Sequence, residues 1–247
     1  MNIIISPAKK MNINNDDLVN EYSPVFIDKT NILYNKLKEL SYDELKKLLA
    51  CNDDIAELNY DRYKYMDLNK NLSPAILTYE GIQYKYMSPN SFTEDEFKYV
   101  KDHLKILSGF YGVLNPFDGV VPYRLEMQAK FKVNESKNLY DFWGDSIYKE
   151  VTKDSNVIIN LASKEYSKAI EKYLCDDDVF ITCIFGEMNA GKIKVKATEA
   201  KMARGLMVRY MAANNISDIE EIKKFSDLSF KYSEEHSSEK EFVFLKQ

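Results

Sequence analysis

The N-terminal segment MNIIISPAKKM, residues 1–11, places three consecutive isoleucines before a proline and two lysines. A short β-branched run of this kind predicts a strand buried in a sheet, and Pro7 marks the loop that follows it. A second such run, NVIINLA at residues 156–162, is followed by the polar segment SKEY at residues 163–166. Because open α/β sheets bind ligands beyond the ends of their buried strands, we expect both following segments to border a site.

Helical and extended patterns alternate along the remainder of the chain. Apolar residues recur at helical spacing in residues 28–68, 93–104, 140–151, 163–174 and 198–215. A strand pattern occupies residues 75–79, and hairpin patterns occupy residues 178–197 and 228–246. The pairs Ser41–Glu44 and Thr93–Glu96 have the spacing of helix capping boxes. We therefore predict an α+β fold, a single compact mixed α/β domain over residues 1–247 with a central sheet and surrounding helices.

Composition places the chain among ordinary globular proteins, with 247 residues, 45% hydrophobic and 30% charged. The formal net charge of -5 argues mildly against a general nucleic-acid coat protein, but a local basic groove can still bind nucleic acid. No apolar run approaches the roughly 18 residues that a membrane span needs, and the signal-peptide pattern is missing from the N-terminus. We expect a cytoplasmic protein without a membrane partner.

Cysteine and histidine are too few and too scattered to predict a metal site. The chain has three cysteines and two histidines, at Cys51, Cys175, Cys183, His103 and His236, without CxxC spacing. Neither a disulfide framework nor a zinc site is indicated, and we expect no metal and no cofactor.

Three segments match catalytic signatures only in part. GEMNAGKI, residues 186–193, has the spacing of a phosphate-binding P-loop, but Ile193 replaces the magnesium-binding Ser or Thr, and a hairpin turn is the better interpretation. SPAK, residues 6–9, fits the S-x-x-K signature of acyl-enzymes, but the partner motifs are missing from the sequence. Ser108 does not have the preceding glycine of a nucleophile elbow.

The segment SGFYGVLNPFDGVVPYRLEM, residues 108–127, has an unusual composition. It contains three of the chain's eight glycines, two of its six prolines and one of its four arginines. Two prolines stiffen the second half, which displays the polar residues Asp118, Tyr123, Arg124 and Glu126. A rigid display of polar groups is more typical of a site than of a simple connection.

A basic element comprises the second strand of the first hairpin and the helix after it. Between residues 192 and 209 the only acid is Glu199, and the cations are Lys192, Lys194, Lys196, Lys201, Arg204 and Arg209. Lys201 and Arg204 share one side of the predicted helix, which we expect to be exposed. A solvated surface is one interpretation. Since three of the four arginines lie in this element and in residues 108–127, anion recognition is the other.

Five ordered motifs resemble those of the YaaA family of bacterial peroxide-stress proteins. They are IISPAK, ILSGFYGVLNPFDGVVPYRLEM, NLYDFW, NLASKEY and AKMARG, and together they cover essentially the whole chain. The chain departs from the family pattern at Gln128, usually glycine, and at Lys164, usually asparagine. The resemblance implies a cytosolic peroxide-stress protein that limits damage by intracellular iron and binds nucleic acid through a helix-hairpin-helix-like element. It implies no established catalytic reaction.

The resemblance suggests that Gly109 and Gly112 form this hairpin after the helix at residues 93–104, with backbone N–H groups that bind phosphate. The alternative is that both glycines only turn the chain under Phe110 and Tyr111.

The leading hypothesis is a DNA-binding cleft between SPAK, PYRLEM, NLASKEY and AKMARG. The residues expected to contact nucleic-acid phosphates are Ser6, Lys9, Gly109, Gly112, Arg124, Ser163, Tyr166, Lys201 and Arg204. Arg124, Glu126 and Glu165 form either an ordered ionic network at the site or an internal structural salt bridge.

Two other hypotheses remain open. In one, the cleft is an active site for a nucleotide or nucleic acid, with Glu126 or Glu165 as general base. In the other, the protein is a scaffold whose tyrosine-rich stretches, residues 60–66 and 79–87, contact a protein partner.

Overall fold

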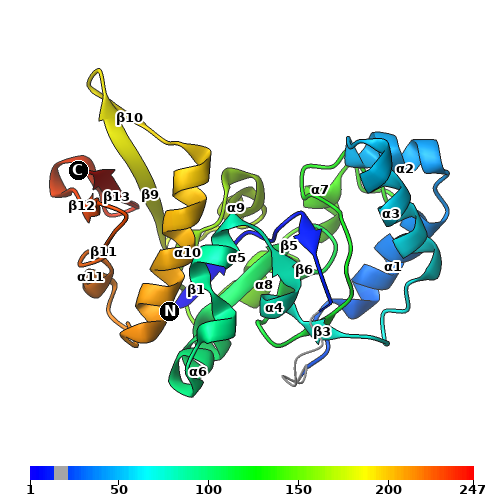
Figure 1. Cartoon of the computed structure of the whole chain (residues 1–247), viewed down its shortest axis with the longest axis horizontal. Coiled ribbons are helices and arrows are strands. Elements are labelled where there is room, and N and C mark those ends of the chain that lie inside the picture. The colour runs from blue at the N-terminus through cyan, green and yellow to red at the C-terminus, as the bar shows by residue number, and fades with distance from the viewer. Residues whose placement is uncertain (14–21) are drawn as a thin grey trace.

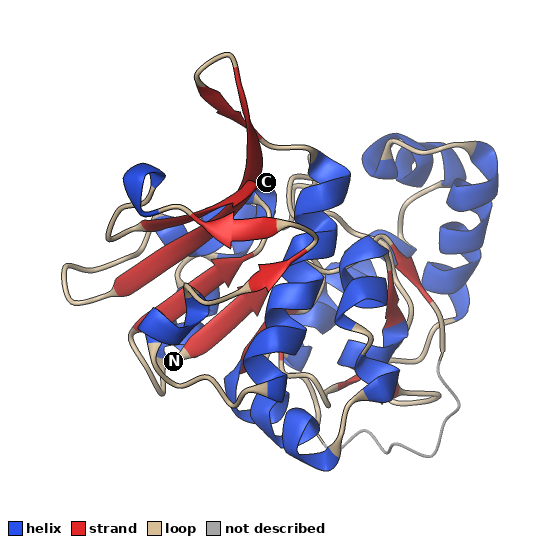
Figure 2. Ribbon diagram, turned by 60° about the vertical axis from the view of Figure 1, so that its left-hand side comes forward, coloured by secondary structure: helices blue, strands red, loops and turns tan. Residues whose placement is uncertain are grey.

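The computed structural model describes residues 1–13 and 22–247, which form a nine-stranded mixed sheet with helices on both faces (Figures 1 and 2). The strand order is β11-β12-β13-β9-β8-β1-β5-β6, and β10 pairs with β9. The strands of this sheet are β1 (Asn2–Ile5), β5 (Leu104–Ser108), β6 (Gly112–Leu114), β8 (Val157–Leu161), β9 (Val179–Asn189), β10 (Lys192–Lys194), β11 (Ser226–Asp227), β12 (Phe230–Tyr232) and β13 (Glu241–Lys246). Two smaller sheets pair β2 (Lys10–Met11) with β4 (Tyr79–Glu80) and β3 (Ser73–Pro74) with β7 (Gly119–Val120).

The centre of the large sheet is parallel. β1 lies between β5 and β8 and runs parallel to both, with Ile3 opposite Leu104 on one side and Ile159 on the other. The three isoleucines of β1 are fully buried, as expected for a strand covered on both faces. The chain leaves β1 toward β5 and leaves β8 toward β9, so the two connections go to opposite sides of the neighbouring strands β1 and β8. The β1–β8 boundary is therefore a topological switch point, where open sheets leave a crevice.

Helices cover the sheet and extend beyond one end. They are α1 (Ile27–Lys38), α2 (Tyr42–Leu49), α3 (Asp53–Tyr65), α4 (Ala75–Thr78), α5 (Ile82–Met87), α6 (Glu94–His103), α7 (Leu139–Trp143), α8 (Ser146–Thr152), α9 (Lys164–Glu171), α10 (Ala197–Ala213) and α11 (Ile219–Ile222), with 3-10 turns at Pro89–Ser91 and Glu234–His236. α10 packs on α5, α6 and β9, and α8 packs on β6, β8 and α9. Figure 1 shows α1, α2 and α3 gathered at one end of the molecule.

Most of the predicted elements are confirmed. Both capping boxes form, at the starts of α2 and α6. The hairpins at residues 178–197 and 228–246 form as β9–β10 and β12–β13, so the P-loop interpretation is excluded. The strand predicted at residues 75–79 is wrong, because this apolar run forms the short helix α4 and only Tyr79 enters a strand. The helix predicted at residues 140–151 is two helices separated at Gly144.

The helix-hairpin-helix-like element is not confirmed. α6 is followed directly by strand β5, and Gly109 lies in the tight turn from β5 to the antiparallel strand β6, which begins at Gly112. Both glycines are buried, so their N–H groups are not displayed to a phosphate. The alternative interpretation, in which these glycines turn the chain, agrees with the structure.

Gly109 has a positioning role. A Cβ atom built at Gly109 would lie 2.4 Å from the carbonyl oxygen of Leu125, so only glycine lets the backbone of residues 125–127 pass so closely. The indole Nε1 of Trp143 donates to the carbonyl oxygen of Gly109 at 3.0 Å and fixes the turn from the other side. The turn thereby sets the path of the PYRLEM segment.

A buried hydroxyl network supports the same segment. The Tyr123 hydroxyl lies 2.5 Å from Ser108 Oγ and 2.7 Å from the Tyr79 hydroxyl. Ser108 Oγ also accepts from the backbone N–H of Phe110 and Tyr111, at 3.1 and 2.9 Å. Burial is the main reason that the pKa of Tyr123 rises to about 12, so its hydroxyl remains a protonated donor at neutral pH. Residues 108–127 thus fold as one rigid unit.

Helices α5 and α10 approach each other closely at Gly205. A Cβ atom there would lie 2.1 Å from the carbonyl oxygen of Gln83, so a larger residue would force the helices apart. This contact places the first half of α10, with Lys201 and Arg204, directly beside α5.

Candidate functional site

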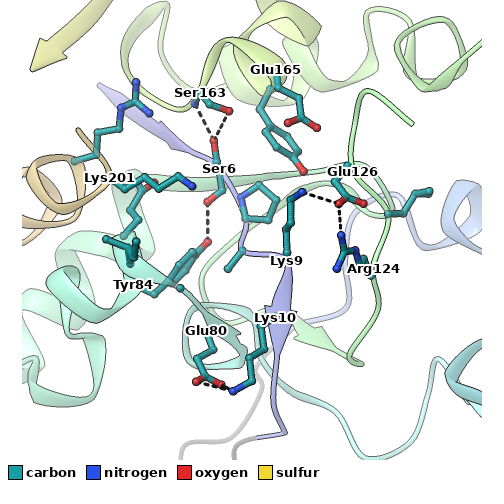
Figure 3. Close-up of a pocket in the computed structure, with 18 of the residues that line it drawn as sticks. Ser6, Lys9, Lys10, Glu80, Tyr84, Arg124, Glu126, Ser163, Glu165 and Lys201 are labelled. Atoms are coloured by element: carbon teal, nitrogen blue, oxygen red, sulfur yellow. Dashed lines mark hydrogen bonds and ion pairs between the residues drawn. The ribbon is translucent and has the colours of Figure 1, made fainter. Parts of the chain in front are cut away.

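A cavity of about 380 Å³ lies beyond the carboxyl ends of β1 and β8, at the switch point of the sheet (Figure 3). The four segments predicted to form a cleft do converge on it. The predicted residues that line it are Ser6, Lys9, Arg124, Glu126, Ser163, Glu165, Tyr166, Lys201 and Arg204. Gly109 and Gly112 lie in the buried β5–β6 turn instead.

Two serines join the ends of the adjacent strands. Ser6 Oγ accepts from the backbone N–H of Ser163 at 2.8 Å and donates to Ser163 Oγ at 3.2 Å. The Tyr84 hydroxyl of α5 donates to the carbonyl oxygen of Ser6 at 3.1 Å. These bonds hold the loops after β1 and β8 together where they line the cavity. Figure 3 shows Ser6 bonded to Ser163 on one side and to Tyr84 on the other.

Glu126 is the centre of an ionic cluster. Its Oε1 lies 3.0 Å from Arg124 Nη2 and 3.1 Å from Lys9 Nζ. The Arg124 and Glu126 side chains are each only 12% exposed, whereas Lys9 is 67% exposed and reaches the pair from solvent. The Tyr63 hydroxyl donates to the carbonyl oxygen of Arg124 at 2.7 Å and fixes its backbone. Of the predicted network of Arg124, Glu126 and Glu165, the pair Arg124–Glu126 forms, and Lys9 is its third member in place of Glu165.

Glu165 is free of this cluster. Its Oε1 accepts from the backbone N–H of Gln128 at 3.3 Å, and the Tyr140 hydroxyl donates to its carbonyl oxygen at 2.7 Å. Partial burial, followed by the nearby charge of Glu126, raises the pKa of the Glu165 carboxyl. A carboxyl with a raised pKa can exchange protons closer to neutral pH, which suits acid–base chemistry.

The cations of α10 differ in environment. Lys201 is exposed and lies across Ser6 from Lys9 and Glu126 (Figure 3). The expectation that Arg204 is equally exposed is wrong, because Arg204 is half-buried beside the close contact of α10 with α5 and its Nε atom is buried. Burial is the main cause that lowers the pKa of the Arg204 guanidinium. In residues 1–13 and 22–247, no carboxylate forms an ion pair with Lys201 or Arg204.

Three buried donors around the cavity have no hydrogen-bond partner in the described parts of the chain. They are Gln83 Nε2, Arg124 Nε and Arg204 Nε, and all three residues line the cavity. A buried donor without a partner costs about 1–3 kcal/mol, and native proteins keep few of them. Their concentration at one cavity indicates a site whose partners arrive with a ligand.

Sequence reasoning missed the contribution of residues 79–87. Glu80 and Gln83 line the cavity, and Lys10 Nζ lies 2.8 Å from Glu80 Oε2 at its edge. Tyr79 and Tyr84 are buried, so these two tyrosines belong to the core and the site and do not form the contact surface of the scaffold hypothesis. In the other stretch of that hypothesis, Tyr65 is 73% exposed, so that part stays a prediction. Its aromatic pattern gave no sign of a polar role for Gln83, whose place depends on the contact with α10.

Lys164, one of the two departures from the family pattern, forms an ion pair with Glu171 of the same helix. Its positive charge is therefore compensated within α9.

The described residues hold no group of three or more His, Cys, Asp or Glu side chains placed to bind a metal ion. Burial raises the pKa of the Cys183 thiol to about 12, so this cysteine is an inert core residue. No helix within the described ranges has the length and apolar character of a membrane span.

Fold and cavity together define an α/β protein with a cavity at the switch point of a largely parallel sheet, lined by more cationic side chains than carboxylates. Comparison with known proteins gives the family: the chain belongs to the YaaA family, because the family model described as peroxide stress protein YaaA matches residues 1–236. The resemblance inferred from the five motifs is confirmed.

Three relatives align with this chain over almost its full length. It is 56% identical over 246 residues to a UPF0246 protein of Desulfitobacterium hafniense, covering 100% of this chain and 98% of the relative. It is 52% identical over 246 residues to a UPF0246 protein of Lachnoclostridium phytofermentans, covering 100% and 96%. A UPF0246 protein of Agathobacter rectalis is 52% identical over 244 residues, with 99% and 98% covered.

Proposed function

We propose that this protein serves in the cytoplasmic peroxide-stress response by binding DNA phosphates in the switch-point cavity, and that it thereby limits iron-dependent damage. The observation that carries the proposal is that Arg204, whose buried Nε has no hydrogen-bond partner in residues 1–13 and 22–247, lines the cavity together with Lys201, which forms no ion pair with a carboxylate in the same ranges. DNA phosphates hold a layer of condensed cations, and a protein that neutralises phosphates releases them. Release of bound iron from the strand would protect it where peroxide is present.

The charge of the cavity supports an anionic ligand. Five cationic side chains and three carboxylates line it. Glu80 is paired with Lys10, and Glu126 with Arg124 and Lys9. Lys201 and Arg204 are the cations left to meet phosphate, even though the chain as a whole carries a net charge of -5.

The test is the salt dependence of DNA binding. The double variant Lys201→Ala with Arg204→Met should weaken binding and lower the slope of log affinity against log salt by about 2, one for each lost phosphate contact. The matched control is Lys36→Ala with Lys38→Ala on α1, outside the cavity lining. Equal loss in both double variants would show diffuse electrostatics, and a flat salt response of the wild type would remove the DNA proposal.

Glu165 supports a second candidate, an enzyme that acts on a nucleotide or nucleic acid. Its carboxyl faces the cavity without an ion pair among the described residues and has a raised pKa, whereas Glu126 is held between two cations. In this hypothesis Glu165 is the general base, and Lys201 and Arg204 stabilise developing negative charge. Glu165→Gln should keep ligand binding and abolish turnover. The hypothesis fails if the wild type turns over no nucleotide or nucleic acid at any pH.

A further inference from the structure

We propose that the cavity recognises one terminal phosphate monoester of a nucleotide, at the end of a DNA strand or on a free mononucleotide. The inference deepens the proposed function and rests on it for the presence of phosphate in the ligand. It adds the chemical form of that phosphate.

The volume of the cavity limits the part of a ligand that can enter to about one nucleotide. Its volume of about 380 Å³ corresponds to a cube with an edge of about 7 Å and lies at the low end of small-molecule sites, about 300–1,000 Å³. The major groove is only one part of a DNA duplex and is already about 12 Å wide, so an intact duplex is wider than the cavity and cannot enter it. A single nucleotide at a strand end can reach the interior, with the remaining strand outside.

The charge in the cavity fits a monoester better than an internal phosphodiester. Five lining cations against three carboxylates leave an excess of two positive charges. A phosphate monoester carries about -1.5 to -2 at pH 7, whereas each backbone phosphodiester carries one negative charge. A single phosphate group compensates both Lys201 and Arg204 only when it is a monoester.

The unpaired donors fit the additional oxygen atoms of a monoester. Arg124 Nε and Arg204 Nε belong to planar guanidinium groups that suit two-point binding of phosphate. Gln83 Nε2 adds a neutral donor from α5. A terminal phosphate has three free oxygens, against two in a diester, so it can satisfy donors that converge from different elements.

The test compares short single-stranded oligonucleotides of one sequence that carry a 5′-phosphate, a 3′-phosphate or hydroxyl groups at both ends. Deoxyadenosine monophosphate and deoxyadenosine are the free ligands. We expect one phosphorylated end to raise affinity by about 10- to 100-fold, the effect of charge-assisted hydrogen bonds. Arg204→Met and Lys201→Ala should each reduce this preference. Lys192→Ala, on the exposed strand β10, carries the same charge change as Lys201→Ala and should keep it.

Each outcome decides between the two proposals. If only the free monophosphate shows phosphate-dependent binding, the monoester site stands and the DNA proposal falls. If all oligonucleotides bind equally and the monophosphate does not compete, the monoester inference is overturned while DNA binding stands. If no probe binds, both are wrong. A phosphate preference that both cavity variants retain would also overturn the assignment to this cavity.

Discussion

Replacement of Arg204 by methionine should stabilise the free protein while it weakens phosphate binding. The guanidinium is largely buried, its Nε has no hydrogen-bond partner in residues 1–13 and 22–247, and burial lowers its pKa. Methionine keeps a long flexible side chain in the same space and removes the uncompensated charge.

The magnitude follows from the buried donor. Relief of one unsatisfied buried group is worth about 1–3 kcal/mol, and exchange of buried charge for apolar groups of similar volume often stabilises by a comparable amount. For a chain of 247 residues, each kcal/mol shifts the melting temperature by about 2–4 °C, so we expect a rise of about 2–12 °C.

Urea and thermal unfolding without ligand measure this change, and Arg209→Met is the matched control on the same helix. Arg209 Nη1 donates to Ser91 Oγ at 2.7 Å and to the carbonyl oxygen of Ser88 at 3.2 Å, and its guanidinium lies 5.5 Å from the Phe92 ring centroid. Loss of these contacts should destabilise the control by about 1–3 kcal/mol.

A loss of stability in Arg204→Met as large as that in Arg209→Met would refute the reasoning. Arg204 would then have a structural partner in the free protein, and its cavity position would carry no information about a ligand.

Two further predictions concern residues 108–127. Gly109→Ala should destabilise the fold by about 1–3 kcal/mol in urea unfolding, because the new Cβ would meet the Leu125 carbonyl oxygen at 2.4 Å; unchanged stability would show that the PYRLEM segment can shift. Burial raises the pKa of Asp118 from its ordinary 3.8 to about 6, so the folded state binds this proton more tightly than the unfolded chain. The contribution of Asp118 to stability should therefore fall by up to about 3 kcal/mol as pH rises from about 4 to 6, and Asp118→Asn should remove that fall. Identical pH profiles of wild type and variant would contradict the assignment.

Local patterns predicted the strands that organise this fold, and topology explains why the site could be located from them. Residues 2–5 and 157–161 are β-branched runs with clear ends, and parallel strands bring their following loops to one edge. β5 was missed because Leu104–Ser108 follows α6 without a glycine or proline to mark the boundary. The run at residues 75–79 was too short to distinguish a strand from a helical turn.

The remaining site residues depend on contacts that no local pattern contains. Gln83 lines the cavity and Arg204 is half-buried because α10 packs on α5 at Gly205, far away in sequence. Helical spacing correctly placed Lys201 and Arg204 on one side, but it could not show that a second helix covers part of that side.

The burial of Arg204 is also the strongest argument that the cavity binds a ligand rather than only carrying surface charge. An exposed lysine such as Lys201 costs little to keep, since exposed charges contribute about 0–1 kcal/mol to stability. In contrast, the buried Nε of Arg204, which has no partner in the described parts of the chain, lowers the stability of the free protein, and in the proposed site it would gain a hydrogen bond when an anion enters. Because Arg204 lies beside the close contact of α5 and α10, binding in the proposed site would need little reorganisation, and ligands that cannot satisfy its donors would be rejected. The destabilisation of the free protein and the selectivity of the site therefore have the same cause.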